Sequence, residues 1–470
     1  MPSRILLVSA NRCAIPERVF PLGLTCLQAA LRRAGHQCLW LDLLDQAGQL
    51  DETLQSFQPE FVAISLRNID DVSIGKRETF FDDLPSLCAA VRLGTACRII
   101  VGGSGFSIFP AQLLELSGAD YGIAGEGEVS LPRLLESLEA GACREDIPGL
   151  VFRKGDRVVI NPPKPMPLDG EVIEADRPAS AAARYLRASG VLNVQTQRGC
   201  PHRCCYCTYP VLEGREHRGR PADLVAEEFA QLARLDARYA FIVDSVFNSS
   251  SRHVEEVCEA ILRRGIKLSW GCFLRPAGLT AELMRLMVRA GLTHAEFGSD
   301  SFCDEVLAAY QKGFAFEDIR HSTELARQED VDCCHFLIAG GPGENLETLR
   351  QGFKNARHLP SSTVLAVAGM RIYPQTALHS RAVAEGRIQA EDNLLVPRYY
   401  LAPGLSEESV LGQLREFARH APNWVVGDPV PAYTALVERL RRRGVAGPLW
   451  SYFSVIQRLW PQGPARGPLL

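Results

Sequence analysis

The sequence predicts an α/β protein with two parallel-sheet domains and a smaller, mainly helical C-terminal domain. Short β-branched runs alternate with helical segments over the first 140 residues, and the same alternation returns after residue 190. A proline-rich stretch separates the two series. We therefore expect a doubly wound, Rossmann- or flavodoxin-like domain over residues 1–145, a hairpin and linker over 146–190, a partial (β/α)6 barrel over 191–376 and an accessory domain over 377–470.

The first domain is predicted from buried parallel strands and amphipathic helices in alternation. The strands are expected at Arg4–Val8, Cys38–Asp42, Phe61–Ser65, Arg98–Val101 and Tyr121–Ala124, and two of the helices at Gly23–Ala34 and Leu84–Leu93. A sheet of this kind binds ligands at the carboxyl ends of its strands. Two further runs, Leu150–Arg153 and Arg157–Ile160, flank a Lys-Gly-Asp turn and predict a hairpin.

The second domain is predicted in the same way. Its strands are expected at Asn193–Gln197, Ala240–Val243, Leu268–Cys272, Ala295–Gly298, Asp332–Ile338 and Val364–Ile372. Helical segments between them include Ala222–Leu235, Arg252–Arg264, Ala281–Ala290 and Phe316–Arg327. Six strands with right-handed crossovers form a partial barrel whose chemistry lies at its C-terminal mouth.

Composition narrows the class of protein. The net charge is −4 with no basic stripe, which argues against nucleic acid as the main partner. No apolar run reaches the roughly 20 residues that a membrane span needs. The first ten residues enter a strand-like run directly and do not resemble a signal peptide, so we expect a cytoplasmic protein.

One group stands apart among the fifteen cysteines. Cys200, Cys204 and Cys207 have the spacing Cys-x3-Cys-x2-Cys within one loop. Three thiolates on a short loop can bind three irons of a cubane cluster and leave the fourth iron open. A structural zinc site usually needs four ligands in two separated pairs; His202 is the available fourth ligand but lies inside the loop. Cys205 lies outside the spacing and is expected to be a small loop residue.

With Tyr206 before its third cysteine, this loop resembles that of the radical S-adenosylmethionine (SAM) superfamily. The resemblance implies a [4Fe–4S] cluster and SAM, whose cleavage yields a 5′-deoxyadenosyl radical. It extends to Phe241–Asn248, to Glu296–Ser301, to the glycine-rich Phe336–Glu344 and to Gly369–Pro374. It implies that Tyr206 packs near the adenine and that Asp300 stands where the family has glutamate. The residues expected at SAM are Tyr206, Asp244, Ser299, Asp300, Gly340 and Gly341. Tyr206, Asp300 and Arg371 are the candidate catalytic residues, and Arg371 is expected to meet a carboxylate or phosphate.

The N-terminal domain resembles the cobalamin-binding domains fused to radical SAM barrels. The resemblance rests on Pro21–Leu24, Gly35-His36, Asp42, Val101–Gly103 and Gly125–Glu128. It implies a cobalamin site at Ser65, Gly102, Gly103, Gly125, Glu126 and Gly127. The Asp-x-His-x-x-Gly motif of cobalamin mutases, whose histidine binds cobalt, does not follow the first strand; Asn11-Arg12-Cys13 stands there. The pattern resembles the cobalamin-dependent radical SAM methylases, with a lower cobalt face that is open or faces another side chain.

The resemblance implies a methyltransferase that acts on an unactivated carbon of a small metabolite or lipid precursor. One SAM methylates cobalamin, a second gives the radical, and the electron comes from a donor such as flavodoxin or ferredoxin. The C-terminal domain is expected to wall the substrate, with Tyr399, Tyr400 and Trp424 as candidates. Three alternatives stay open: an oxidative cyclase or ring-rearranging enzyme, a methylthiotransferase, and a non-catalytic binding module. The second usually needs another cluster, but Cys13, Cys38 and Cys97 are scattered.

Overall fold

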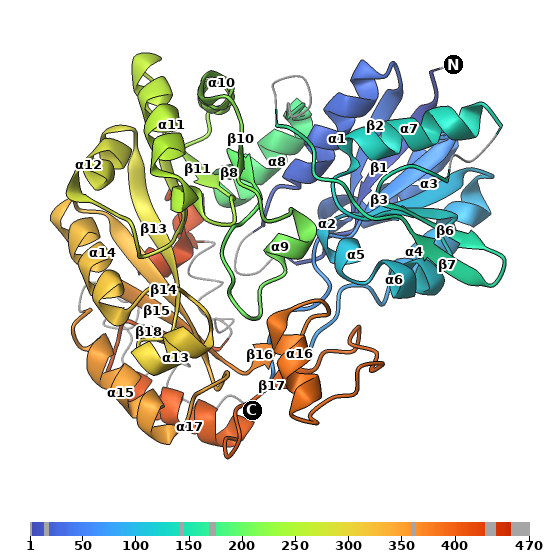
Figure 1. Cartoon of the computed structure of the whole chain (residues 1–470). Helices are drawn as coiled ribbons and strands as arrows, with labels where there is room; N and C mark the ends of the chain where they lie inside the picture. The colour runs from blue at the N-terminus through green and yellow to red at the C-terminus, as the bar shows by residue number, and fades with distance from the viewer. Residues whose placement is uncertain are drawn as a thin grey trace.

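The computed structural model describes residues 2–13, 18–141, 145–168, 175–359, 362–427 and 439–452. It consists of two α/β units that lie side by side, each built on a seven-stranded sheet (Figure 1). The first unit contains the N-terminal strands, and the second contains the strands that follow residue 190. The predicted fold class is confirmed.

The first sheet has the strand order β2-β1-β3-β4-β5-β6-β7. The strands are β1 (Arg4–Ser9), β2 (Gln37–Asp42), β3 (Phe61–Ser65), β4 (Arg98–Gly102), β5 (Tyr121–Ile123), β6 (Leu150–Lys154) and β7 (Arg157–Ile160). The first five are parallel, whereas β6 and β7 are antiparallel. The predicted hairpin therefore forms, but it extends the first sheet and does not stand in the linker. Pairing with β6 covers the edge of β5 that would otherwise be exposed.

Helices cover both faces of this sheet, so that its strands are buried on both sides. They are α1 (Leu22–Arg33), α2 (Leu43–Gln46), α3 (Leu50–Phe57), α4 (Leu84–Gly94), α5 (Ser104–Ile108), α6 (Pro110–Ser117) and α7 (Gly127–Glu139), with a 3-10 turn at Ala47–Gln49. Alternate residues of β1 join different cores: Leu6 and Val8 lie in one, Ile5 and Leu7 in the other. This is the two-sided burial that the continuous apolar runs predict.

The second sheet is parallel throughout, in the order β18-β15-β14-β13-β12-β11-β8. Its strands are β8 (Val191–Val194), β11 (Tyr239–Ile242), β12 (Ser269–Leu274), β13 (Leu292–Asp300), β14 (Asp332–Ala339), β15 (Ser362–Ala368) and β18 (Trp424–Val426). Six strands were expected, and β18 is the seventh. Three residues are too short a run for the pattern to indicate a strand. It is the packing of Trp424 against Phe353 and Phe417 that places β18 beside β15.

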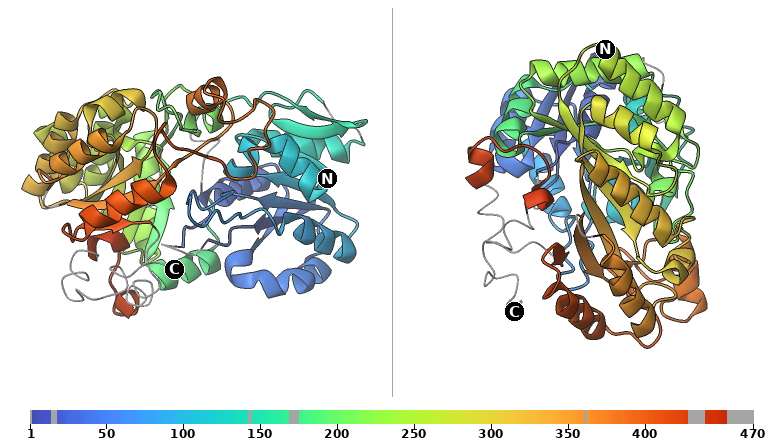
Figure 2. Two further views of the ribbon diagram at one scale, coloured as in Figure 1. Left: turned by 90° about the horizontal axis from the view of Figure 1, so that it is seen from below. Right: turned by 90° about the vertical axis from the view of Figure 1, so that its left-hand side faces the viewer.

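Helices cover the outer face of the second sheet (Figure 2). They are α10 (Ala222–Arg234), α11 (Ser251–Arg263), α12 (Ala281–Arg289), α13 (Asp304–Ala309), α14 (Phe316–Gln328), α15 (Leu346–Ala356) and α17 (Glu407–Ala418), and α8 (Ala179–Ser189) precedes the sheet. Side-chain caps define several of their starts: Ser250 accepts from the amide of His253, and Thr280 from the amide of Leu283. No helix in the described part of the chain is long and apolar enough to cross a membrane.

Short elements lie between the two units. A two-residue ladder joins β9 (Gln197–Arg198) to β10 (Arg218–Gly219), with α9 (Tyr209–Leu212) between them. A second ladder joins β16 (Met370–Arg371) to β17 (Tyr399–Tyr400), and α16 (Ala377–Ala384) separates these strands. In Figure 1 this second group lies below the junction of the units. Two 3-10 turns complete the described elements, at Phe247–Ser249 and Leu449–Tyr452.

The C-terminal region is part of the barrel and does not stand apart from it. The indole of Trp450 donates to Glu296 of β13 (2.7 Å) and packs edge-on against His294. Trp424, expected in a substrate wall, is instead 3% exposed within an apolar core. Tyr400 is 1% exposed, and its hydroxyl donates to Glu385 (2.8 Å). Those two residues pack in the core, because burying their large aromatic rings removes much apolar surface from water.

Candidate active site

The cysteine loop begins at β9 with a backbone turn that only glycine can make. Gly199 has φ +86°, and a Cβ there would lie 1.9 Å from the carbonyl oxygen of Glu216. Its amide donates to the Glu213 carboxylate (3.1 Å), and the amide of Cys200 donates to the carbonyl of Gly214 (3.1 Å). The loop therefore closes on the segment that follows it, and Cys200 is held in a fixed, buried position.

The three predicted cluster ligands come together. The amide of Cys207 donates to the carbonyl of Cys204 (3.2 Å), and both thiols lie within electrostatic reach of Cys200. Burial raises the pKa of Cys204, and it raises that of Cys207 to about 12. Buried thiols of this kind keep their protons unless a metal replaces them. The donor set therefore fits a cluster.

The geometry of these thiols is not that of a mononuclear site. Across the described ranges, no group of three or more His, Cys, Asp or Glu side chains is arranged to hold a single metal ion. In a cubane cluster each thiolate binds a different iron, so the sulfur atoms stand further apart than ligands of one ion.

Cys205 lies beside the ligands but turns away from them. Its amide donates to the carbonyl of Tyr310 (3.0 Å), and its carbonyl accepts from the amide of Leu378 (2.7 Å). The side chain is buried in an apolar core, and this burial raises the pKa of the thiol to about 12. The expected role as a small structural residue agrees with this position.

Asp300 and Tyr206, both predicted at SAM, are in direct contact. The Tyr206 hydroxyl donates to Oδ2 of Asp300, which also accepts from Nζ of Lys312 (2.5 Å). Asp300 has φ +61°, a conformation that aspartate tolerates better than most residues. Burial raises the pKa of Tyr206, and the nearby Asp300 carboxylate adds to this effect. The three side chains form one buried polar group beside the cysteine loop.

Lys312 belongs to this polar group and was not predicted from the sequence. It follows α13 in an ordinary turn and belongs to no motif, so its only signal was a charge next to an apolar helix. Its side chain is 7% exposed. The Asp300 and Cys204 charges outweigh burial and raise the pKa of its ammonium. A second cation, Arg275, donates to the carbonyl of Lys312 (3.0 Å). Burial, together with the nearby charge of Arg275, lowers the pKa of His202 to about 4.

Two residues expected at SAM, Asp244 and Ser299, have hydrogen-bond partners within the protein. Asp244 accepts from the amide of Thr196 (2.7 Å) and from its hydroxyl (2.5 Å), just beyond the end of β8. Ser299 bonds to Nδ1 of His335 (2.8 Å). Burial raises the pKa of Asp244 to about 7 and lowers that of His335 to about 3. The side chains of Asp244, Ser299 and His335 are completely buried, and buried polar groups are usually hydrogen-bonded in this way.

Arg371, expected to meet a carboxylate or phosphate, meets a carboxylate of the protein. Its Nε donates to Oδ2 of Asp70 in the first unit (2.8 Å). Its other nitrogens donate to the carbonyls of Ile372 and Leu394 (both 2.7 Å). Arg371 and Asp70 are each 1% exposed. Arg371 therefore ties the two units together.

The glycine-rich turn after β14 packs against Tyr310. A Cβ on Gly341 would lie 2.3 Å from the Tyr310 hydroxyl, which accepts from the Gly341 amide (3.0 Å) and donates to the Ile338 carbonyl (2.7 Å). The amide of Gly340 donates to the Glu344 carboxylate, and burial raises the pKa of that carboxyl to about 7. Contacts within the protein thus explain why glycine stands at both positions of this turn.

The residues expected at cobalamin gather at one edge of the first sheet. In the ladder Ser65 lies opposite Gly102, and Gly102 lies opposite Ile123, so that β3, β4 and β5 end together. Gly103, Gly125 and Gly127 follow at the same edge. Arg67, which was not predicted, stands in the loop after β3, where burial lowers its pKa and Tyr209 of the cysteine-loop region opposes that shift.

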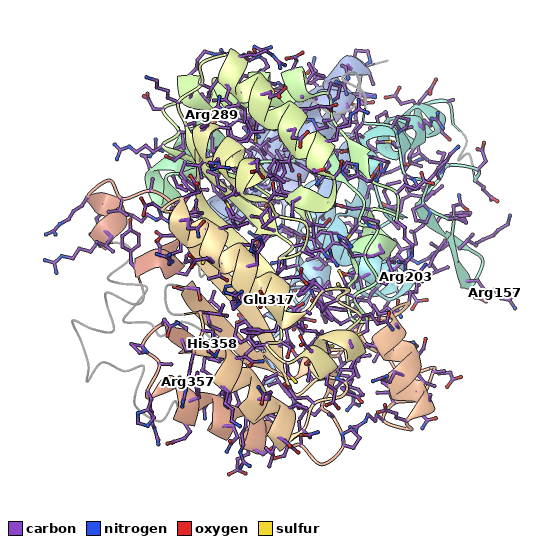
Figure 3. The ribbon with its side chains drawn as sticks, turned by 60° about the vertical axis from the view of Figure 1, so that its left-hand side comes forward. Arg157, Arg203, Arg289, Glu317, Arg357 and His358 are labelled. Carbon is purple, nitrogen blue, oxygen red and sulfur yellow. The ribbon has the colours of Figure 1, made fainter. Side chains whose placement is uncertain are left out.

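Glu126, expected at cobalamin, joins the two units. Its carboxylate accepts from Arg218 of β10 (2.6 Å) and from the amide of Met166 (2.9 Å). Beside it, Glu128 accepts from Arg198 of β9 (2.6 Å). These buried pairs connect the start of α7, at the ligand edge of the first sheet, to the ladder that carries the cysteine loop. Figure 3 shows Arg203 of that loop where the units meet, whereas Arg289 and Glu317 lie on the outer helices.

Comparison with known proteins supports both halves of this description. The B12 binding domain model matches residues 10–135, and the radical SAM superfamily model matches residues 194–354. The chain is 25% identical to tryptophan 2-C-methyltransferase of Streptomyces laurentii, over 81% of this chain and 74% of that protein. It is 28% identical to hopanoid C-3 methylase of Methylococcus capsulatus, over 71% of this chain and 64% of that protein, and so spans less than two thirds of it.

The fold also has a solved counterpart. The radical SAM methyltransferase TsrM of Kitasatospora setae, solved with cobalamin and a [4Fe–4S] cluster bound, superposes with a TM-score of 0.85. The match covers 99% of each chain at 22% identity. The radical SAM domain implies the cluster and SAM as cofactors, and the B12 binding domain implies cobalamin. Residues 10–135 therefore form a B12 binding domain, and residues 194–354 form a radical SAM domain.

Proposed function

We propose that this enzyme transfers a methyl group, supplied by cobalamin, to an unactivated carbon of a small metabolite or lipid precursor. The observation that carries the proposal is the buried junction between the units. Arg198 and Arg218, which flank the cysteine loop, pair with Glu128 and Glu126 at the ligand edge of the first sheet. These pairs support the proposal, because a methyl donor bound at that edge and a radical source at the loop would lie on adjoining segments of the junction. The names of the relatives, methylases of tryptophan and of a hopanoid, support the same reaction class.

The residues divide the work between the two units. When bound, the cluster and SAM supply a 5′-deoxyadenosyl radical that abstracts hydrogen, and cobalamin supplies the methyl group. Cys200, Cys204 and Cys207 would hold the cluster. Tyr206 and Asp300 would present a fixed polar surface to SAM, because their hydrogen bond orients both side chains. At the opposite edge, the residues from Ser65 to Gly127 would hold the corrin.

The buried ion pairs at the junction would keep water from the reacting carbon. Glu126 and Glu128 have side chains 7% and 5% exposed, and their arginine partners are similarly covered. A reactive carbon radical needs this exclusion, since a dry site prevents side reactions. We further expect a reduced flavodoxin or ferredoxin to provide the electron.

The test is anaerobic incubation of the reconstituted enzyme with SAM, cobalamin and titanium(III) citrate, with tryptophan and a hopanoid as substrate probes. Methyl transfer requires S-adenosylhomocysteine as well as 5′-deoxyadenosine. An oxidative cyclase forms only 5′-deoxyadenosine, and a binding module forms neither. Cys204→Ala is the matched control, which should lose 5′-deoxyadenosine while the corrin absorption of bound cobalamin remains. Absence of S-adenosylhomocysteine from an enzyme loaded with both cofactors would refute the proposal.

A further inference from the structure

The buried lysine beside the cysteine loop has no role in the function described so far. Nζ of Lys312 donates to Asp300 (2.5 Å) and lies 5.9 Å from the ring centre of Tyr206, which stands in the sequence between the second and third cluster cysteines. Burying an ammonium is costly unless it is paired, and a structural pair could have been placed anywhere in the core. Here the ammonium lies beside the cysteine loop, where its charge reaches Cys204.

We propose that Lys312 is a positioning residue whose buried charge beside the cysteine loop sets the reduction potential of the cluster. One-electron reduction, with the electron drawn from a reduced flavodoxin, a ferredoxin or a chemical reductant, adds one negative charge to the cluster. A fixed positive charge at a ligand sulfur stabilises that reduced form. The inference rests on the cluster and is independent of methyl transfer.

Asp300 has the opposite effect in this arrangement. It holds the ammonium in place, but its own negative charge disfavours reduction. At the Cys204 thiol the influence of Lys312 exceeds that of Asp300. Arg275 is a weaker contributor, because its guanidinium donates to the carbonyls of Lys312 and Gly313 and to no cluster ligand among the described residues. Of the two charges nearest Cys204, Lys312 therefore has the larger effect.

The two charges make predictions of opposite sign. Lys312→Met removes the cation and keeps the length of the side chain, so the potential falls. Asp300→Asn removes the anion, so the potential rises. Lys312→Arg keeps the charge and restores most of the wild-type value. An unpaired charge at this distance would change the ratio of reduced to oxidised cluster by roughly a thousandfold. Because Asp300 offsets much of the field, we expect about a tenfold fall for Lys312→Met, which is about 59 mV for a one-electron couple.

The experiment is a redox titration of the reconstituted holoenzyme, followed by electron paramagnetic resonance of the reduced cluster. Arg289→Met, on the exposed end of α12 (Figure 3), is the matched control for loss of a distant cation. Cobalamin binding by the first unit shows that each variant is folded. The proposal is overturned if, at the same applied potential, the ratio of reduced to oxidised cluster differs less than twofold between Lys312→Met and Arg289→Met. If Lys312→Met assembles no cluster, Asp300→Asn decides, and an unchanged potential there also overturns it.

The outcomes separate this inference from the proposed function. A shifted potential without S-adenosylhomocysteine supports the role of Lys312 and refutes methyl transfer. An unshifted potential with normal S-adenosylhomocysteine formation does the reverse.

Discussion

Replacing Arg371 with methionine removes the cation of a buried pair that joins the two units. Asp70 then keeps only the amide of Val72 (3.1 Å) and the hydroxyl of Tyr373 (3.4 Å) as donors. Methionine fills a similar volume, so the cost comes from the stranded carboxylate and from carbonyls that lose their donors. Breaking a buried pair in this way costs about 3–5 kcal/mol. We expect Arg371→Met to lower the free energy of unfolding by that amount.

The double variant tests whether the pair itself is responsible. Asp70→Asn together with Arg371→Met removes both charges, so it should recover about 1–3 kcal/mol relative to Arg371→Met alone. The measurement is equilibrium unfolding in urea, followed by fluorescence and by circular dichroism, because coincident transitions justify a single free energy. Arg419→Met is the control, since its pair with Glu416 is exposed and worth less than about 1 kcal/mol. Equal stability of Arg371→Met and Arg419→Met would refute this reasoning.

Further changes test the cysteine loop, the carboxyl of Glu344 and the contact of Trp450 with the barrel. Alanine at any of the three cluster cysteines should abolish the iron–sulfur absorbance but not cobalamin binding, whereas Cys205→Ala should keep both; loss of the cluster from Cys205→Ala would contradict our ligand assignment. Glu344 has a folded pKa of about 7, above its unfolded value of 4.5, so its stabilising contribution is complete below pH 4.5 and is lost as pH rises through 7. Glu344→Gln should therefore match wild type in free energy of unfolding at pH 4 and exceed it at pH 8 by up to about 3 kcal/mol, measured in urea; parallel pH profiles would argue against this. Trp450→Phe removes the indole that donates to buried Glu296, so it should lower the free energy of unfolding, measured by thermal unfolding, by about 1–3 kcal/mol. The exposed variant Arg419→Met is again the control and should change it less.

Local patterns were enough to predict most of the fold. Phe61–Ser65 is a strand because five apolar or small residues stand between polar turns, and β3 has those bounds. The Lys-Gly-Asp turn forms its hairpin because Gly155 adopts a positive φ. The cysteine spacing lies within a single loop, so chain length alone keeps the three thiols together.

The tertiary structure decided which charged residues serve the site and which serve the fold. Asp244, Glu126 and Arg371 each follow the end of a strand in one of the two sheets, which is where ligand-binding residues are expected, yet each is ion-paired or hydrogen-bonded within the protein. Arg371 and Asp70 are 301 residues apart, and no local pattern connects them.

Lys312 illustrates the reverse case. Nothing in its neighbourhood along the chain marks it, but the end of β13 and the cysteine loop meet at its ammonium. A buried charge must find a partner, and the fold alone determines whether that partner belongs to the core or to a cofactor site. The sequence by itself therefore determined the strands, the cysteine ligands and the two-domain class of this enzyme. Only the packing of the two units decided how its buried charges are paired.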